Sequence, residues 1–448
     1  MRIFQQLHSK LGDFWWYSIL MFIALRCGDV INAVVGLWLV PKYVSQEELG
    51  AVMPLMQFTA FIGFPMAVLM TVFSRYIARF KAQGEDGKAK SAVKWFIGIA
   101  VGLNVASGLF AIFLMPHFFE RIRVVKGSLG ILVLAAGLLG AISPVFSRAL
   151  QGLKKFNTIT LLNLFGAPIR LVVMLVALPF RALSGYMLGQ CAPSVFCIGV
   201  SSWVLRKDLG NSVKSELFWK GCGREFLRYF SLVFLSLGLG SVSAFVMPMI
   251  IRQRLPEVDS AAYYMITRFA ELATYASVTL AFVMFPMVSE AHAKGQKSLK
   301  LFLYTSAGSV GFGVLASLVL WLFGGFIFDL IPTCRPYVGY VPDMAFLALT
   351  MSLAMACGNF TDYEFACNRF AFLWWSLPLA VLQTLLVVCF TGYTFFYGRL
   401  PASVVDWMGS LHIATLRNLI WVMFAFVAVR IVIIAVQLSV RQLRQRSL

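Results

Sequence analysis

The chain has 448 residues, of which 60% are apolar and only 13% are charged, and its mean hydropathy is +0.82. A soluble protein of this length cannot hide so much apolar surface from water, so lipid must cover a large part of it. The formal net charge of +19 would suit a nucleic-acid partner. However, the basic residues are spread over the ends of apolar runs, and no soluble basic domain carries them, so we expect no nucleic-acid binding.

The apolar runs predict an all-α, polytopic membrane protein of about twelve transmembrane helices. In chain order the predicted spans are 14–40, 50–73, 92–115, 128–147, 157–179, 183–205, 226–251, 261–288, 298–324, 338–360, 370–395 and 417–439. The first run is too long for a cleavable signal peptide, so we expect it to remain as a helix. The least distinct borders lie at Pro179 and at 393–416.

A weak internal repeat indicates two halves. The sequence KSAVKWF, at 90–96, follows a basic segment after the second span, and KSLKLF, at 297–302, follows a similar segment after the eighth. Six spans in each half would give both halves the same orientation, as in transporters built from parallel repeats. We therefore expect two six-helix lobes, 1–215 and 216–448, although two basic loops at the membrane surface can also resemble each other by chance.

The positive charges predict the orientation of the chain. One set of alternate loops and both termini hold 24 Lys and Arg residues, whereas the opposite loops hold 10. Because cytoplasmic loops carry the excess of positive charge, both termini are expected in the cytoplasm. Arg75 and Arg79 lie one turn apart at the inner end of the second span. They are expected to anchor that end, and they could attract a phosphate-bearing headgroup.

Five charged side chains inside the spans are the main candidates for a functional site. Arg26 and Asp29 lie three residues apart, hence on one helix face, and Arg268 and Glu271 repeat that spacing in the other half. Arg170 lies in the fifth span with no acidic residue within a turn. Charges at this depth are costly unless they pair or face water, so they indicate a polar cavity. Alternatively, Arg26 and Asp29 could form a structural pair, the second pair could reach the headgroups, and Arg170 could be a packing donor.

A further arginine, Arg430, lies nearer the cytoplasmic end of the last span, and we expect its side chain to reach the headgroups there. The four histidines lie in or beside loops, and no Cys or His spacing suits a metal site. No GxxxxGK[ST] run for nucleotide binding occurs either. The sequence therefore predicts neither a metal nor another cofactor.

Four features carry a resemblance to a known family. They are LVPKYVSQEELGAV at 39–52, ALQGLKKFNTITLLNLFGAPIRLVVMLVAL at 149–178, RFAELATYASVTLAFVMFPMVSEAHAKG at 268–295, and the twelve-span pattern with a basic C-terminus. In this order they resemble the polysaccharide-transporter, or O-antigen flippase, branch of the multidrug/oligosaccharidyl-lipid/polysaccharide (MOP) exporter superfamily. The resemblance covers nearly the whole chain. It implies a flippase in the cytoplasmic (inner) membrane that moves a polyprenyl pyrophosphate-linked oligosaccharide outward by alternating access, for cell-surface polysaccharide synthesis.

The charged residues fit that substrate chemically. Arginine binds phosphate through a planar fork that stays charged, so Arg26, Arg170 and Arg268, with Asp29 and Glu271, are the predicted substrate-binding residues. The two acidic residues are also the candidates for coupling to H⁺ or Na⁺. The expected partners are the lipid-linked oligosaccharide, membrane lipids and other polysaccharide-assembly proteins.

Two other classes of function remain open. A drug or small-cation exporter of the same superfamily would favour a negative cavity, whereas the charged residues at mid-span are four Arg against two acids. A membrane glycan polymerase or ligase would place its chemistry in a large outer loop. The longest outer loop, 393–416, offers only Arg399, Asp406 and His412 for such chemistry. We therefore expect a transporter and not an enzyme.

Overall fold

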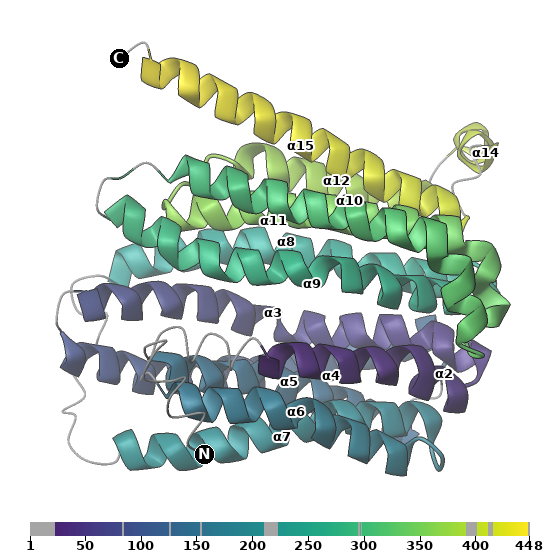
Figure 1. Cartoon of the computed structure of the whole chain (residues 1–448), viewed down its shortest axis with the longest axis horizontal. Coiled ribbons are helices and arrows are strands. Elements are labelled where there is room, and N and C mark those ends of the chain that lie inside the picture. Colours follow the sequence, from purple (N-terminus) through teal and green to yellow (C-terminus); the bar gives the residue numbers. More distant parts are fainter. Residues whose placement is uncertain are drawn as a thin grey trace. The chain divides into compact units, whose positions relative to one another are not determined.

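The computed structural model describes residues 23–82, 85–124, 127–152, 155–209, 223–293, 296, 298–390, 401–410 and 415–446. Within these residues every regular element is a helix, and no strand is present (Figure 1). The predicted all-α fold is therefore confirmed.

The helices of the first half begin with Ile23–Tyr43, which includes the π-helical turn η1 (Val35–Leu39) and the short α2 (Val40–Tyr43). They continue with α3 (Gln46–Ala82), α4 (Asp86–Ile122), α5 (Gly127–Gly152), α6 (Phe156–Ala177) and α7 (Ala182–Leu209). The second half contains α8 (Gly223–Arg254), α9 (Glu257–Ala293), α10 (Leu299–Leu330), η2 (Arg335–Tyr340), α11 (Val341–Ala366), α12 (Leu373–Phe390), α14 (Ala402–Ser410) and α15 (Leu416–Arg446).

Ten helices among the described residues are long and apolar enough to cross a membrane. Two further helices are α9, with 37 residues, and the shorter α12, whose apolar part is Leu373–Cys389. Together they give the polytopic arrangement of about twelve helices that the apolar runs predict.

The ends of the helices follow from the local sequence. Before α3, the Ser45 Oγ accepts a hydrogen bond from the backbone N–H of Glu48 at 3.2 Å and donates to its carboxylate at 3.3 Å. This pairing satisfies a backbone donor that has no partner inside the helix. Between α6 and α7, a turn at 178–180 contains Pro179, whose ring cannot continue a regular helix. The border between the fifth and sixth spans therefore lies at Pro179, as the sequence predicts.

Two helices of the first half have counterparts of equal length in the second half. Both α3 and α9 contain 37 residues, and they begin 211 residues apart, at Gln46 and Glu257. Both α5 and α11 contain 26 residues, and they begin 214 residues apart, at Gly127 and Val341. The match supports the internal repeat that the two loop sequences indicate.

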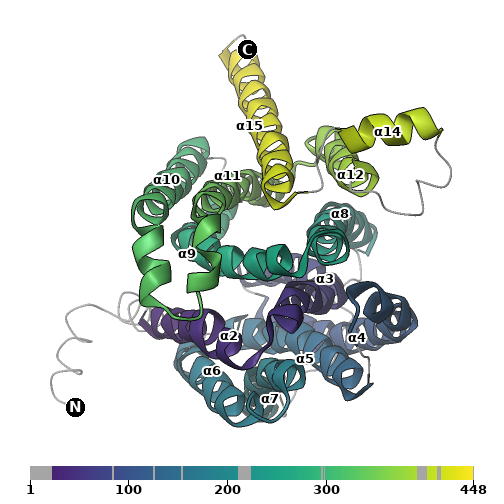
Figure 2. The ribbon, with the colours of Figure 1, turned by 90° about the vertical axis from the view of Figure 1, so that its right-hand side faces the viewer.

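By its internal packing, the chain divides into two compact units. The first comprises Met1–Glu48 and Pro54–Phe245, and the second Leu49–Met53 and Val246–Leu448. In the first unit, α5 packs against α4, α6 and α7; in the second, α9, α10 and α11 pack together, and α15 packs against α11 and α12 (Figure 2). The predicted lobe boundary at 215/216 lies outside the described residues and stays a prediction.

Candidate functional site

The first helix carries three polar side chains at intervals of three residues, Arg26, Asp29 and Asn32. Arg26 Nη1 lies 2.9 Å from Asp29 Oδ2, and the two side chains remain 32% and 28% exposed. Three residues advance about 300° around a helix, so the three side chains follow one flank. Gly28 lies against α6, because a Cβ at that position would meet the Ala167 Cβ at 3.6 Å. The first helix is therefore held close to α6.

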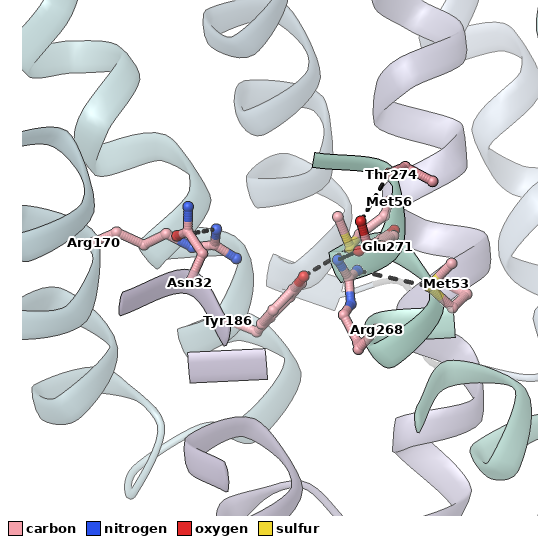
Figure 3. A network of polar contacts seen from close by, with 8 residues as sticks. All are labelled: Asn32, Met53, Met56, Arg170, Tyr186, Arg268, Glu271 and Thr274. Atoms are coloured by element: carbon pink, nitrogen blue, oxygen red, sulfur yellow. Dashed lines mark hydrogen bonds and ion pairs between the residues drawn. The ribbon is translucent and has the colours of Figure 1, made fainter. Parts of the chain in front are cut away.

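Arg170 extends from α6 to this polar flank (Figure 3). Its Nη1 donates a hydrogen bond of 3.0 Å to Oδ1 of Asn32, a residue 138 positions earlier in the chain. The amide is neutral, so this bond orients the guanidinium without cancelling its charge. Helix α6 itself contains no acidic residue. The first unit thus brings Arg26, Asp29 and Arg170 onto two neighbouring helices.

The second unit contains the other predicted pair, on α9. Arg268 Nη1 lies 2.7 Å from Glu271 Oε2, with the side chains 16% and 28% exposed. The other terminal nitrogen, Nη2, lies 3.6 Å from the sulfur of Met53 (Figure 3). The guanidinium carbon lies 5.2 Å from the centre of the Tyr264 ring. The ring face attracts the cation, and the thioether is a weak acceptor. These contacts fix the position of the guanidinium and leave the pair partly accessible.

The remaining predicted site residues are only partly described. Arg75 and Arg79 lie within α3, but their side chains are outside the described part of the structure, so their role at the headgroups stays a prediction. Asp406 is exposed on α14, whereas Arg399 and His412 lie outside the described residues. Among the residues that the structure describes, no three His, Cys, Asp or Glu side chains form a group that could hold a metal ion.

The structure adds polar residues that the sequence pattern did not single out. Helix α11 continues to Ala366, six residues beyond the predicted end at 360, and so contains Asp362 and Glu364. Glu364 is fully buried, and both of its oxygens accept hydrogen bonds from Arg441 of α15. The predicted span ends at 360 because charged residues begin there, so the sequence alone places Glu364 in a loop. Its partner on another helix is what allows the helix to continue.

The prediction that the Arg430 side chain reaches the cytoplasmic headgroups is wrong. Its Nη2 donates a hydrogen bond of 3.0 Å to Oε1 of Gln383, on α12. Arg430 also lies midway along the membrane-crossing part of α15, Leu416–Leu443, because that helix extends farther in the C-terminal direction than the apolar run. The side chain is thus turned toward a neighbouring helix instead of the membrane surface.

No family model and no curated protein sequence matches the chain. Solved structures do match over nearly its whole length. A multidrug resistance MATE family transporter of the MOP superfamily, in an inward-facing conformation, is 15% identical with a TM-score of 0.67, covering 96% of this chain and 99% of its own. The Vibrio cholerae MATE transporter VcmN, in a mutant form, is 15% identical with a TM-score of 0.63, covering 99% of each chain. A MATE structure in the straight conformation is 14% identical with a TM-score of 0.67, and the match covers 96% of this chain and 95% of the MATE chain. The chain therefore has the fold of these transporters.

Proposed function

We propose that the chain is a membrane transporter that moves a lipid-linked oligosaccharide from the inner to the outer leaflet by alternating access. The fold of MATE transporters supports transport as the general class of function. The substrate has three parts: a pyrophosphate, a polar glycan and a long apolar tail. The pyrophosphate needs fixed cations, the glycan needs a hydrated path, and the tail needs contact with lipid.

The observation that carries this proposal is the hydrogen bond between Arg170 and Asn32. It directs a guanidinium from within the span Asn157–Ala177 to the polar flank of the first helix. Charged side chains at such depth are costly and typically mark the path of a substrate or ion. A phosphate group matches the guanidinium fork in both charge and geometry.

The two arginine–carboxylate pairs have supporting roles in the proposal. Arg26 and Arg268 add phosphate donors, and Asp29 and Glu271 release them when the carboxylates bind H⁺ or Na⁺. Both carboxylates are 28% exposed, so an ion can reach them without unfolding of the helix. Arg75 and Arg79 attract the headgroup at the inner leaflet. The transporter works in the cytoplasmic membrane with both termini inside, without a cofactor and not as an enzyme, beside other polysaccharide-assembly proteins.

The second candidate function is export of drugs or small cations. It is favoured by the similar solved structures, since the first of these is described as a multidrug resistance transporter. Asp29, Glu271 and Asp362 would then attract the positive charge of the substrate. The two functions differ in the sign of the substrate's charge, which makes them separable in one assay.

Transport by the purified chain in vesicles tests the proposal. We expect the protein to move a fluorescent polyprenyl pyrophosphate-linked sugar between leaflets, under an imposed proton or sodium gradient, and to leave the cationic dye ethidium behind. Protein-free vesicles provide the background rate. Transport of ethidium without movement of the anionic lipid would reject the flippase and select the cation exporter.

Labelling of introduced cysteines tests the orientation. In a cysteine-free background, Gly87→Cys should be protected from an impermeant thiol reagent in intact cells, and Val258→Cys should react. Both positions are exposed, and a Cβ at Gly87 would meet nothing within 4 Å, so burial will not mask the result. The charge distribution places the first inside and the second outside. Reaction at Gly87→Cys alone would reverse the proposed orientation.

A further inference from the structure

Helix α15 carries three arginines along its membrane-crossing length, and the two outer ones are matched by carboxylates of α11. Near the start, Arg417 donates to both oxygens of Asp343 at 2.9 and 3.4 Å. Near the end, Arg441 donates to both oxygens of Glu364, one of them at 2.7 Å. Two-nitrogen contacts of this kind are the strong form of an arginine ion pair. Arg417 and Arg441 are therefore both neutralised by carboxylates of α11.

The middle arginine, Arg430, is hydrogen-bonded to a neutral side chain instead of a carboxylate. Its hydrogen bond goes to the neutral Gln383 of α12, and its Nε is buried without a hydrogen-bond partner among the described residues. Neither α12 nor α15 contains an acidic residue that could neutralise it. A buried charge with an unused donor is unfavourable on its own, which indicates that an anion completes the site.

The depth of Arg430 limits what that anion can be. It lies 14 residues after Leu416 and 13 before Leu443, hence roughly 20 Å along the helix from either end. The hydrocarbon core is about 30 Å thick, so the phosphates of resident lipids lie about 15 Å or more from its centre. A resident lipid therefore cannot place its phosphate at this arginine. The matching anion is one that passes through the middle of the membrane.

The surroundings suit an anion that carries an apolar tail. Both helices of the site expose apolar side chains on the surface of the second unit: Leu382 (55%) and Leu385 (43%) on α12, and Val429 (45%) and Val432 (61%) on α15. Two turns further along α15, Gln437 accepts a hydrogen bond of 2.8 Å from the indole of Trp375, so this polar side chain between α12 and α15 has a partner within the protein. A phosphate at Arg430 would thus lie between two helices that expose apolar surface to lipid.

A comparable pair joins the first and the fifth long helices of the other half. There, Arg170 of α6 is hydrogen-bonded to the amide of Asn32, whereas here Gln383 of α12 supplies the amide and Arg430 the guanidinium. Each half therefore holds one guanidinium bonded to a neutral amide, and the fifth long helix supplies the guanidinium in the first half and the amide in the second. Two phosphate contacts, one in each half, are what a substrate needs if it is passed along during transport.

We propose that Arg430 and Gln383 form a second binding site for the phosphate or pyrophosphate of the lipid substrate, with its apolar tail lying along the seam between α12 and α15. The inference rests on the proposed function, since only a lipid in transit brings a phosphate to this depth. In the site, the guanidinium donates to the phosphate oxygens through Nε and a terminal nitrogen, and Gln383 holds the other terminal nitrogen in place.

The variant Gln383→Glu tests the site by giving Arg430 the carboxylate that Arg417 and Arg441 already have. The purified full chain is titrated with a long-chain polyprenyl monophosphate in detergent, and binding is followed by native mass spectrometry. We expect affinity to fall about tenfold or more, because the new carboxylate competes for the guanidinium. Arg430→Gln should lose the same contact, and the thermal unfolding curve of each variant reports whether it is folded.

Gln437→Glu is the matched control. It places the same new charge in the same seam, and its carboxylate can still accept the hydrogen bond of Trp375, so binding should stay within about twofold of the unsubstituted chain. Unchanged binding by Gln383→Glu would overturn the site. Displacement of the lipid by equimolar inorganic pyrophosphate would overturn its assignment to a lipid.

The same variant separates this inference from the proposed function. Normal translocation by Gln383→Glu, with unchanged lipid binding, would reject the site and leave the flippase standing. Binding that depends on Arg430 in a chain that moves no lipid-linked sugar would uphold the site and reject the flippase.

Discussion

Replacing Arg441 by alanine is expected to lower stability more than any other single change in α15. Its partner Glu364 is fully buried, so the substitution leaves a carboxylate in the interior without its cation. Removing one member of a buried ion pair typically costs about 3–5 kcal/mol. We expect a clear fall in the thermal unfolding midpoint of the purified protein, together with less folded protein in the membrane.

Two controls define this effect. Lys88→Ala breaks a pair with Glu85 whose side chains are 47% and 36% exposed, and such surface pairs contribute only about 0–1 kcal/mol. The double variant Arg441→Ala with Glu364→Gln removes the buried charge as well, so much of the lost stability should return. A midpoint for Arg441→Ala equal to that of Lys88→Ala would show that the buried pair does not secure α15.

Replacing Arg170 is expected to have the largest effect on transport. Arg170→Gln should nearly abolish movement of the lipid-linked sugar, because glutamine keeps hydrogen-bonding capacity but loses the charge that attracts phosphate. Arg170→Lys should recover activity only partly, since lysine keeps the charge and loses the fork. We expect weaker losses at Arg26 and Arg268, whose charges are each already balanced by a carboxylate on the same helix.

An exposed arginine in the same unit serves as the comparison for Arg170. Arg206 lies in the last turn of α7, and Arg206→Gln removes the same charge with expected activity near that of the unsubstituted chain. A packing role for Arg170 predicts instead that glutamine and lysine work equally well. Membrane levels of each variant must be measured in parallel, so that lost protein is not counted as lost transport.

The sequence predicts the number and course of the helices because each depends on local features. Apolar runs must be long enough to cross lipid, and Pro179 separates two of them within a few residues. Charged residues at helix ends are harder to assign. A run of apolar residues ends at about 360, yet α11 continues through Glu364, because a partner on another helix compensates its charge.

The candidate site is predictable only where its contacts are local. Arg26 with Asp29 and Arg268 with Glu271 follow from spacing on one helix, and the structure shows both pairs. The partner of Arg170 does not follow from spacing, because Asn32 lies 138 residues away and meets it only through the packing of the first helix on α6. The sequence shows which charged residues lie within apolar spans, where they are costly. The packing of the helices determines which partners bind them.

Outward movement of lipid-linked sugar in vesicles, normalised to the amount of folded protein, tests the central proposal most directly. The unsubstituted chain should move the lipid far faster than protein-free vesicles, and Arg170→Gln should reduce that rate nearly to background. Arg206→Gln should remain close to the unsubstituted rate. Full activity of Arg170→Gln would contradict the proposal that this arginine binds the phosphate of a transported lipid.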